Sequence, residues 1–217
     1  MTEAARSEGL VVRVGGRSRT ELVEALRDAS VQLNAHAETL IAHSAFDDPV
    51  GRPLRIVERT VAQLGFEQGA VQSRVFAAAQ EQGLELCPLV TGPYLRLAMM
   101  DQMNAPDSVL SAGRGPSGAV HIGSEPVSED VEYPKGFYLR VLDGQAWLRG
   151  YGCDDTYVWS PAQRLAFLLP DANDQRCASA SFSGRTRGWA EPCLVFDSGH
   201  AQLPSGRAPE IVEARVR

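Results

Sequence analysis

The sequence contains a single lysine, Lys135, so arginine supplies the other positive side chains. The net charge is −6 over 217 residues, and the basic residues form no dense cluster. Phosphate backbones are bound by clustered lysine and arginine, so this balance does not favour nucleic acid as a partner. The preference for arginine has two interpretations: a codon bias, or selection for bidentate anion recognition, which arginine performs better than lysine.

Long apolar runs and paired cysteines are also missing. No stretch approaches the ~18 apolar residues of a membrane span, and the first ten residues, MTEAARSEGL, lack the apolar core of a signal peptide. The four cysteines, Cys87, Cys153, Cys177 and Cys193, form no C-x-x-C pair, whereas zinc sites usually take their ligands in close pairs. We therefore expect reduced thiols in the cytoplasm, no membrane association and no metal.

The motifs of common catalytic and nucleotide sites are absent. GRGPSG (113–118) resembles a phosphate loop only superficially, because it lacks the G-K-[ST] ending and no helix is expected after it. Neither G-x-S-x-G nor H-E-x-x-H occurs. His36 and His43 are seven residues apart on a predicted helix, whereas metal-binding pairs prefer three or four. The sequence therefore predicts no cofactor.

Apolar periodicity predicts about three helices in the first part of the chain, after a short strand at 10–14. Residues 18–46 carry apolar side chains at helical spacing, and Ser18 with Glu21 fits a capping box. A short second helix is predicted over 56–64. A third is predicted over 70–83, ended by Gly83.

After Gly83 the pattern becomes that of extended strands. LELCPL and YLRLAMM are predicted to be strands, with Cys87-Pro88 at the start of the sheet and Gly92-Pro93 as the turn between them. Further strands are predicted in AVHIGSE (119–125) and RLAFLL (164–169).

The clearest local structure is GFYLRVLDGQAWLRGY. Two alternating, aromatic-rich runs flank Asp143-Gly144, which is the strongest short-range hairpin signal. Pairing outward from this turn places Arg140 opposite Trp147 and Tyr138 opposite Arg149. The pair next to the turn is Leu142 with Gln145.

These elements predict an α+β fold, in which about three N-terminal helices pack on a mostly antiparallel sheet of about five strands. We expect a single domain over 1–170, helical over 18–83 and sheet over 84–170. The serine-rich, polar composition after Pro170 predicts a loosely ordered extension over 171–217, with CLVF (193–196) as a candidate edge strand.

Three stretches together resemble an uncharacterised bacterial family: LGFEQGAVQSRVFAAAQEQGLELCPLVTGPYLRL, then GFYLRVLDGQAWLRGY, then VWSP. The resemblance covers about residues 18–169 and implies a helical first half followed by a hairpin-containing sheet. Members are sometimes labelled helicases, but this chain has no Walker loop and no room for two motor domains. The family pattern often has an acid after Cys-Pro-Leu, where this chain has Val90, and a Gln shortly after Leu-Arg-Leu, where it reads AMMDQ. If that acid is catalytic, this chain is impaired.

The main functional hypothesis comes from arginines placed among apolar residues of predicted strands. The hairpin register places Tyr138, Arg140, Trp147 and Arg149 on one face, where guanidinium groups and rings are expected to meet across the strands. One interpretation is a soluble binding or interaction module for a small anionic or planar ligand or for a protein, with Arg96 as a further contact. The other is an ordinary solvent-facing side of a sheet, whose aromatics pack over arginine stems. If the first interpretation holds, we expect that replacing Arg140 and Trp147 together abolishes binding and leaves the melting temperature nearly unchanged.

A small hydrolase or transferase is the alternative, with either Cys87 or an Asp101/His121 pair as catalytic residues. A nucleophilic cysteine needs a base or a positive field to lower its pKa. No histidine lies near Cys87 in the sequence, although the fold could bring His121 to it. The structural alternative is that Cys87 is a small buried residue and His121 a structural histidine within a strand.

Overall fold

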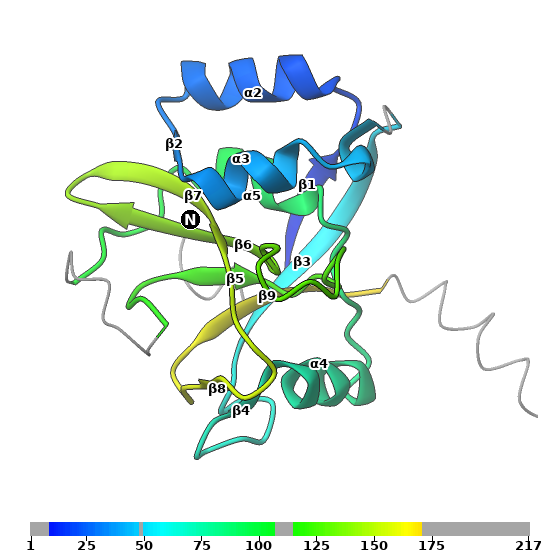
Figure 1. Cartoon of the computed structure of the whole chain (residues 1–217), viewed down its shortest axis with the longest axis vertical. Helices are drawn as coiled ribbons and strands as arrows, with labels where there is room; N and C mark the ends of the chain where they lie inside the picture. Colours follow the sequence, from blue (N-terminus) through cyan, green and yellow to red (C-terminus); the bar gives the residue numbers. More distant parts are fainter. Residues whose placement is uncertain (1–8, 48–49, 107–114, 171–217) are drawn as a thin grey trace, which may run out of the picture.

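The computed structural model describes residues 9–47, 50–106 and 115–170, and its main feature is a curled seven-stranded sheet (Figure 1). Neighbouring strands are antiparallel except for two parallel pairs, β5 with β9 and β2 with β7. The predicted α+β class and mostly antiparallel sheet are confirmed, but seven strands replace the expected five. In spatial order they are β1 (Leu10–Val14), β3 (Arg52–Thr60), β9 (Arg164–Leu168), β5 (Val120–Ile122), β6 (Gly136–Leu142), β7 (Gln145–Tyr151) and β2 (Gln32–Leu33).

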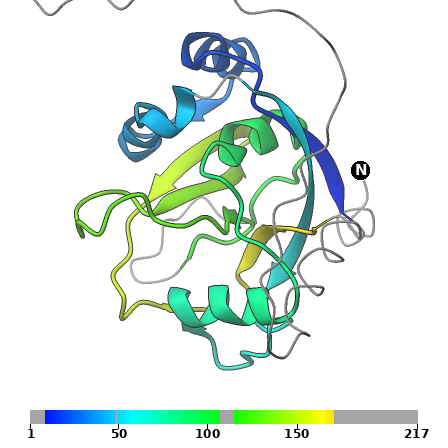
Figure 2. The same cartoon turned by 90° about the vertical axis from the view of Figure 1, so that its right-hand side faces the viewer.

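Helices cover both faces of the sheet, and each face has its own apolar core (Figures 1 and 2). The larger core joins one face to α2 (Arg19–Asp28), α3 (Ala35–Ile41) and α5 (Thr91–Ala98). The smaller core joins the other face to α4 (Gln72–Glu81) and to a two-stranded ribbon. The remaining elements are that ribbon, β4 (Ala70–Val71) with β8 (Val158–Trp159), and the short 3-10 helix η1 (Ser44–Asp47).

The predicted first helix starts at its predicted cap but ends early. Ser18 and Glu21 form the capping box of α2. The helix then closes with a Schellman motif, in which the Ser30 N–H bonds the Arg27 carbonyl and the Val31 N–H bonds the Leu26 carbonyl. Ser30 takes the left-handed conformation (φ 57°) that glycine usually occupies at this position. The prediction of a single helix over 18–46 was therefore wrong. The break was not visible in the sequence, because the residue that ends α2 is Ser30 and not a glycine.

The predicted second helix, over 56–64, is mostly the long strand β3. Ile56 and Val57 are both fully buried because they face opposite cores. A strand that is covered on both sides does not alternate between apolar and polar residues. Its apolar positions therefore coincided with helical spacing, although its β-branched residues favour a strand.

The segment predicted as two strands around Gly92-Pro93 contains helix α5 instead. Pro93 lies in the first helical turn, where its missing N–H breaks no intrahelical bond. Gly92 packs directly on β6, since a Cβ there would lie 2.7 Å from the ring of Phe137. Before the helix, Glu85 makes only an isolated bridge to Leu168, and the Cys87 N–H bonds the Gly123 carbonyl. The strand predicted at 10–14 is β1, but the division into helix over 18–83 and sheet over 84–170 was wrong, because β3 lies in the first range and α5 in the second.

Two other predictions, the third helix and the hairpin, agree with the structure. The third predicted helix is α4, followed by Gly83 in the left-handed region (φ 79°). The hairpin pairs with the predicted register, and Asp143 and Gly144 both have the positive φ of a type I′ turn. The predictions for 171–217, including CLVF, lie outside the described residues.

Asn34 joins α3 to β7. Its side-chain oxygen accepts hydrogen bonds from the Ala37 N–H at the start of α3 and from the Gly150 N–H, and its amide donates to the Gly150 carbonyl. Gly150 allows this approach because any Cβ there would lie 2.6 Å from the backbone carbon of His36. The backbones of α3 and β7 are therefore in direct contact.

We expect Gly150→Ala to lower the free energy of unfolding by about 2–3 kcal/mol, because a backbone atom that cannot rotate away blocks the added methyl group. Urea unfolding followed by circular dichroism measures this change. Gly152→Ala, two residues along, is the matched control: a Cβ there meets nothing within 4 Å, and the expected change is within about 0.5 kcal/mol. Equal stability of the two variants would contradict the close contact.

Candidate functional site

The hairpin register places the predicted arginine and aromatic side chains on one face, but that face is not open to solvent. Tyr138 and Arg140 pair with Arg149 and Trp147 respectively, so all four alternate to the same side of β6 and β7. Arg140 is 0% exposed and Tyr138 is buried, whereas Trp147 and Arg149 are half-buried. The interpretation as a wholly solvent-facing surface was therefore wrong.

Arg140 holds the loop Gly115–Gly118 over this face. Its Nε donates to the Ser117 carbonyl at 2.9 Å, and Nη2 donates to the Ser117 hydroxyl at 3.5 Å. A buried guanidinium requires such partners, since its desolvation is costly. The loop contains no regular secondary structure, so these side-chain bonds help to define its course.

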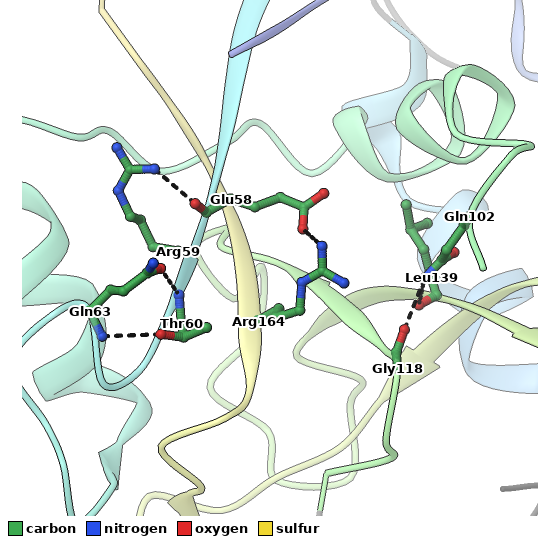
Figure 3. A network of polar contacts seen from close by, with 8 residues as sticks. All are labelled: Glu58, Arg59, Thr60, Gln63, Gln102, Gly118, Leu139 and Arg164. Atoms are coloured by element: carbon green, nitrogen blue, oxygen red, sulfur yellow. Dashed lines mark hydrogen bonds and ion pairs between the residues drawn. The ribbon is translucent and has the colours of Figure 1, made fainter. Parts of the chain in front are cut away.

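Arg96 belongs to α5 rather than to a strand, and it is fully buried. Its Nη1 donates to the Gln102 side-chain oxygen at 2.7 Å. The Gln102 amide in turn donates to the carbonyls of Gly118 at 3.0 Å and Leu139 at 3.3 Å (Figure 3). Arg96 therefore supports the same loop through Gln102, and its predicted place as a surface contact was wrong.

The cation–π contact forms along one strand. The Arg149 guanidinium lies 4.9 Å from the centre of the Trp147 ring, two residues away on β7, instead of across the hairpin as predicted. The Arg149 Nε is buried and has no hydrogen-bond partner among residues 9–47, 50–106 and 115–170. Part of this guanidinium therefore has unused hydrogen-bonding capacity.

A cavity of about 250 Å³ opens beside Tyr138. Its walls come from β5, β6, β7, β8 and the Gly115–Gly118 loop, with glycine backbone between the rings. The lining residues are Gly115, Pro116, His121, Tyr138, Gly150, Tyr151, Gly152, Cys153, Tyr157, Trp159 and Gln163. Sequence reasoning named Tyr138 and His121 but missed Tyr151, Tyr157, Trp159 and Gln163. The aromatic spacing of YGCDDTYVW directly after the hairpin was the available signal.

His121 lies at the centre of the rings. Its ring centroid is 5.1 Å from Tyr138 in a stacked arrangement and 4.8 Å from Trp159 in an edge arrangement. Burial lowers the pKa of His121 to about 3, although a hydrogen bond to the Arg164 backbone partly opposes the shift. The Gln163 amide nitrogen lies 3.2 Å from one ring nitrogen. The imidazole is therefore neutral at physiological pH.

Cys153 lines the cavity as a thiol. Burial, and secondarily the charge of Asp154, raises the pKa of Cys153 to about 11. Its Sγ donates to the Gln72 side-chain oxygen at 3.3 Å, and the Gln72 amide donates to the Tyr151 hydroxyl at 2.9 Å. This short chain of hydrogen bonds ties α4 to the wall of the cavity.

The predicted catalytic candidates are dispersed. Cys87 is buried in the larger core, its thiol faces the Ala166 carbonyl at 3.6 Å, and burial raises its pKa strongly. Asp101 lies in an exposed turn after α5. His121 contacts the cavity rings, Gln163 and the Arg164 backbone.

Within the described ranges, His, Cys, Asp and Glu side chains nowhere gather in threes as a metal site would require. No helix in this part of the chain has the length and apolar character needed to cross a bilayer.

We expect Arg140→Met to destabilise the protein by about 1.5–3 kcal/mol, because it removes the charge-assisted hydrogen bonds from a fully buried side chain to the half-buried Ser117. The matched variant Arg149→Met, on the same face and half-buried, is expected to cost less than about 1 kcal/mol. Urea unfolding compares them. A double replacement of Arg140 and Trp147 should therefore lower the melting temperature, contrary to the expectation from sequence. Similar losses from both single variants would contradict the supporting role of Arg140.

The pKa of His121 makes stability depend on pH. The unfolded histidine takes up a proton near its ordinary pKa of 6.5, whereas the folded one does so only near 3. Below pH 6.5 the unfolded state binds more protons, so stability is complete above that pH and falls as the solution is acidified towards pH 3. We expect a loss of about 2 kcal/mol between pH 7 and pH 5 from this group. Urea unfolding of wild type and His121→Phe over this pH range isolates the contribution of His121. If the free energy of unfolding falls equally with pH in both proteins, the loss does not come from His121.

Comparison with known proteins gives no guide to this site: no family model, curated protein or solved structure matches the chain. The chemistry of the cavity itself therefore carries the functional argument. Its distinguishing features are five ring side chains, a neutral imidazole, a protonated thiol and two guanidinium groups beside one wall.

Proposed function

We propose that this chain is a binding module that holds a small planar ligand with an anionic group in the aromatic cavity. The observation that carries the proposal is the convergence of four aromatic side chains and His121 around one cavity. Aromatic walls favour planar ligands, because rings stack with an energy beyond simple area burial. Largely apolar concavities with a few convergent polar groups are the usual form of small-molecule sites.

The size of the cavity supports a single-ring ligand. Its volume of about 250 Å³ equals the liquid volume of about eight waters at ~30 Å³ each. Sites for drug-sized molecules usually start near ~300 Å³. A ring of six atoms with one or two substituents matches this space better than a nucleotide or a peptide does.

The charge beside the cavity supports an anionic substituent. The guanidinium groups of Arg149 and Arg140 both favour the ionised form of Tyr138, although burial dominates and raises the pKa of Tyr138. Arg140 is engaged by the Ser117 loop, whereas Arg149 is half-buried and its Nε lacks a partner in the described part of the chain. Arg149 is therefore the residue that we expect to meet the anion.

The protonation states favour binding over the alternative of catalysis. A general acid or base works best with a pKa near the working pH. The pKa of His121 is shifted down to about 3 and that of Cys153 up to about 11, so both groups are held uncharged near neutrality. Cys87 is buried in the other core, on the far side of the sheet from these rings.

The test titrates the protein with benzoate and with benzylamine, which have similar size and opposite charge. We expect roughly millimolar binding of benzoate, as a ligand of nine heavy atoms can supply, and at least threefold weaker binding of benzylamine. Saturation-transfer NMR and calorimetric titration measure both.

Arg149→Met should weaken benzoate binding about threefold to tenfold while leaving the fold intact. Arg27→Met, which removes an exposed arginine from α2, is the charge-matched control and should bind as wild type. Preference for benzylamine would contradict the anionic part of the proposal. If neither benzoate nor benzylamine binds, the proposal as a whole is contradicted.

A further inference from the structure

Two buried polar atoms of the cavity residues have no hydrogen-bond partner within the described ranges. They are the side-chain oxygen of Gln163, which is 8% exposed, and the indole Nε1 of Trp159, which is 1% exposed. Buried polar groups in native proteins are nearly always paired, because an unpaired one loses its hydration without compensation. Two such atoms in residues that line one cavity therefore need a common explanation.

His121 determines which atoms are left unpaired. One ring nitrogen donates to the Arg164 carbonyl, which is the hydrogen bond that raises the pKa of His121 against its burial. The Gln163 amide nitrogen lies 3.3 Å from Nδ1 and 3.2 Å from Nε2 of His121, so it can donate to whichever nitrogen of the neutral ring accepts. This arrangement leaves the Gln163 oxygen as a free acceptor. Trp159, whose ring packs against His121, contributes a free donor.

We propose that the ligand is a lactam heterocycle, a planar ring with an N–H next to a carbonyl. This inference rests on the proposed function and specifies its ligand class. The ring N–H would donate to the Gln163 oxygen, and the ring carbonyl would accept from the Trp159 indole. A neutral cyclic amide matches a cavity end whose imidazole carries no charge. The anionic substituent would lie on the Tyr138 side, towards Arg149.

Gly115 and Gln163 both line the cavity, and the Gly115 backbone packs against the Gln163 amide. A Cβ at Gly115 would overlap the nitrogen, oxygen and carbon of that amide, so the backbone rests directly on it. The Gly115 backbone also hydrogen-bonds the Tyr157 hydroxyl. A ligand would therefore reach the Gln163 oxygen when the Gly115–Pro116 backbone shifts aside. Ser117 and Gly118 are held by Arg140 and Gln102, and they would limit the shift to the first two residues of the loop.

The experiment compares three planar carboxylates by calorimetric titration of the whole chain: orotate, its 1,3-dimethyl derivative and benzoate. Orotate has both the lactam edge and the anion, the dimethyl derivative has lost the N–H donors, and benzoate has only the anion. We expect orotate to bind at least tenfold more tightly than either of the others, because a site built to hydrogen-bond a ligand rejects an analogue that leaves its buried groups unpaired.

Gln163→Met removes the acceptor while keeping the length of the side chain. We expect the ratio of orotate affinity to benzoate affinity, at least tenfold in the wild-type chain, to fall to about one in this variant. Equal binding of orotate and benzoate by the wild-type chain would overturn the lactam assignment and leave the proposed function standing. Binding of none of the three would overturn both. If Gln163→Met does not fold, the comparison of the three compounds on the wild-type chain decides the question alone.

Discussion

The pairing of β6 with β7 is the constraint on which the cavity depends. Side chains alternate along these strands, so Phe137, Leu139 and Leu148 enter the larger core. Tyr138 and Arg140 consequently point to the opposite side. A shift of the register by one residue would exchange the two sets, place an arginine in an apolar core and remove one wall of the cavity. The type I′ turn at Asp143-Gly144 prevents this shift, because its two residues adopt the positive φ that a two-residue connection requires.

The second determinant is the use of buried arginines as scaffolding. The loop Gly115–Gly118 has no backbone ladder of its own, yet it forms one side of the cavity. Arg140 binds it directly at Ser117, and Arg96 binds it indirectly through Gln102 at Gly118. Each guanidinium carries several donors in a rigid plane, so it can satisfy carbonyls that no strand reaches. Burying these charges is costly, and each guanidinium accordingly donates to two acceptors. The positive charge of Arg140 also remains near Tyr138, where it favours a negatively charged group.

The parts of the fold that the sequence predicted correctly are those determined by local chemistry. The Asp-Gly turn sets its own backbone angles, and the capping box at Ser18 satisfies its own amides. The errors arose where the local conformation is not determined by residue type alone. Ser30 ends α2 in the left-handed conformation, which serine rarely adopts, so the end of the helix is visible only from the hydrogen bonds to the Leu26 and Arg27 carbonyls. β3 looked helical because both of its faces are buried, which removes the alternation of a half-exposed strand.

Prediction of the candidate site from sequence was limited in the same way, because tertiary contacts form the cavity. Tyr138 was predicted as a binding residue from the hairpin register, and His121 as a catalytic partner of Cys87 or Asp101, but the stacking of the two rings depends on the pairing of β5 with β6. The other walls come from β7, β8 and the turn between them, and their convergence is a property of the tertiary fold. Arg96 was assigned to a surface because a helix was taken for a strand, which reversed its environment from exposed to fully buried.

The distribution of charge around the cavity matches the two kinds of recognition in the proposed ligand. Burial keeps His121 neutral and Cys153 protonated, so a charged ligand group beside His121 would lose its hydration without a counter-charge. At the Tyr138 side, the half-buried Arg149 is in contact with both protein and solvent, so an anion there keeps part of its hydration and gains a guanidinium. A ligand with a neutral polar ring and a charge at its edge satisfies both ends. A compact ion or a purely apolar molecule satisfies one end at most, because the first must give up its hydration and the second leaves Gln163 and Trp159 unpaired.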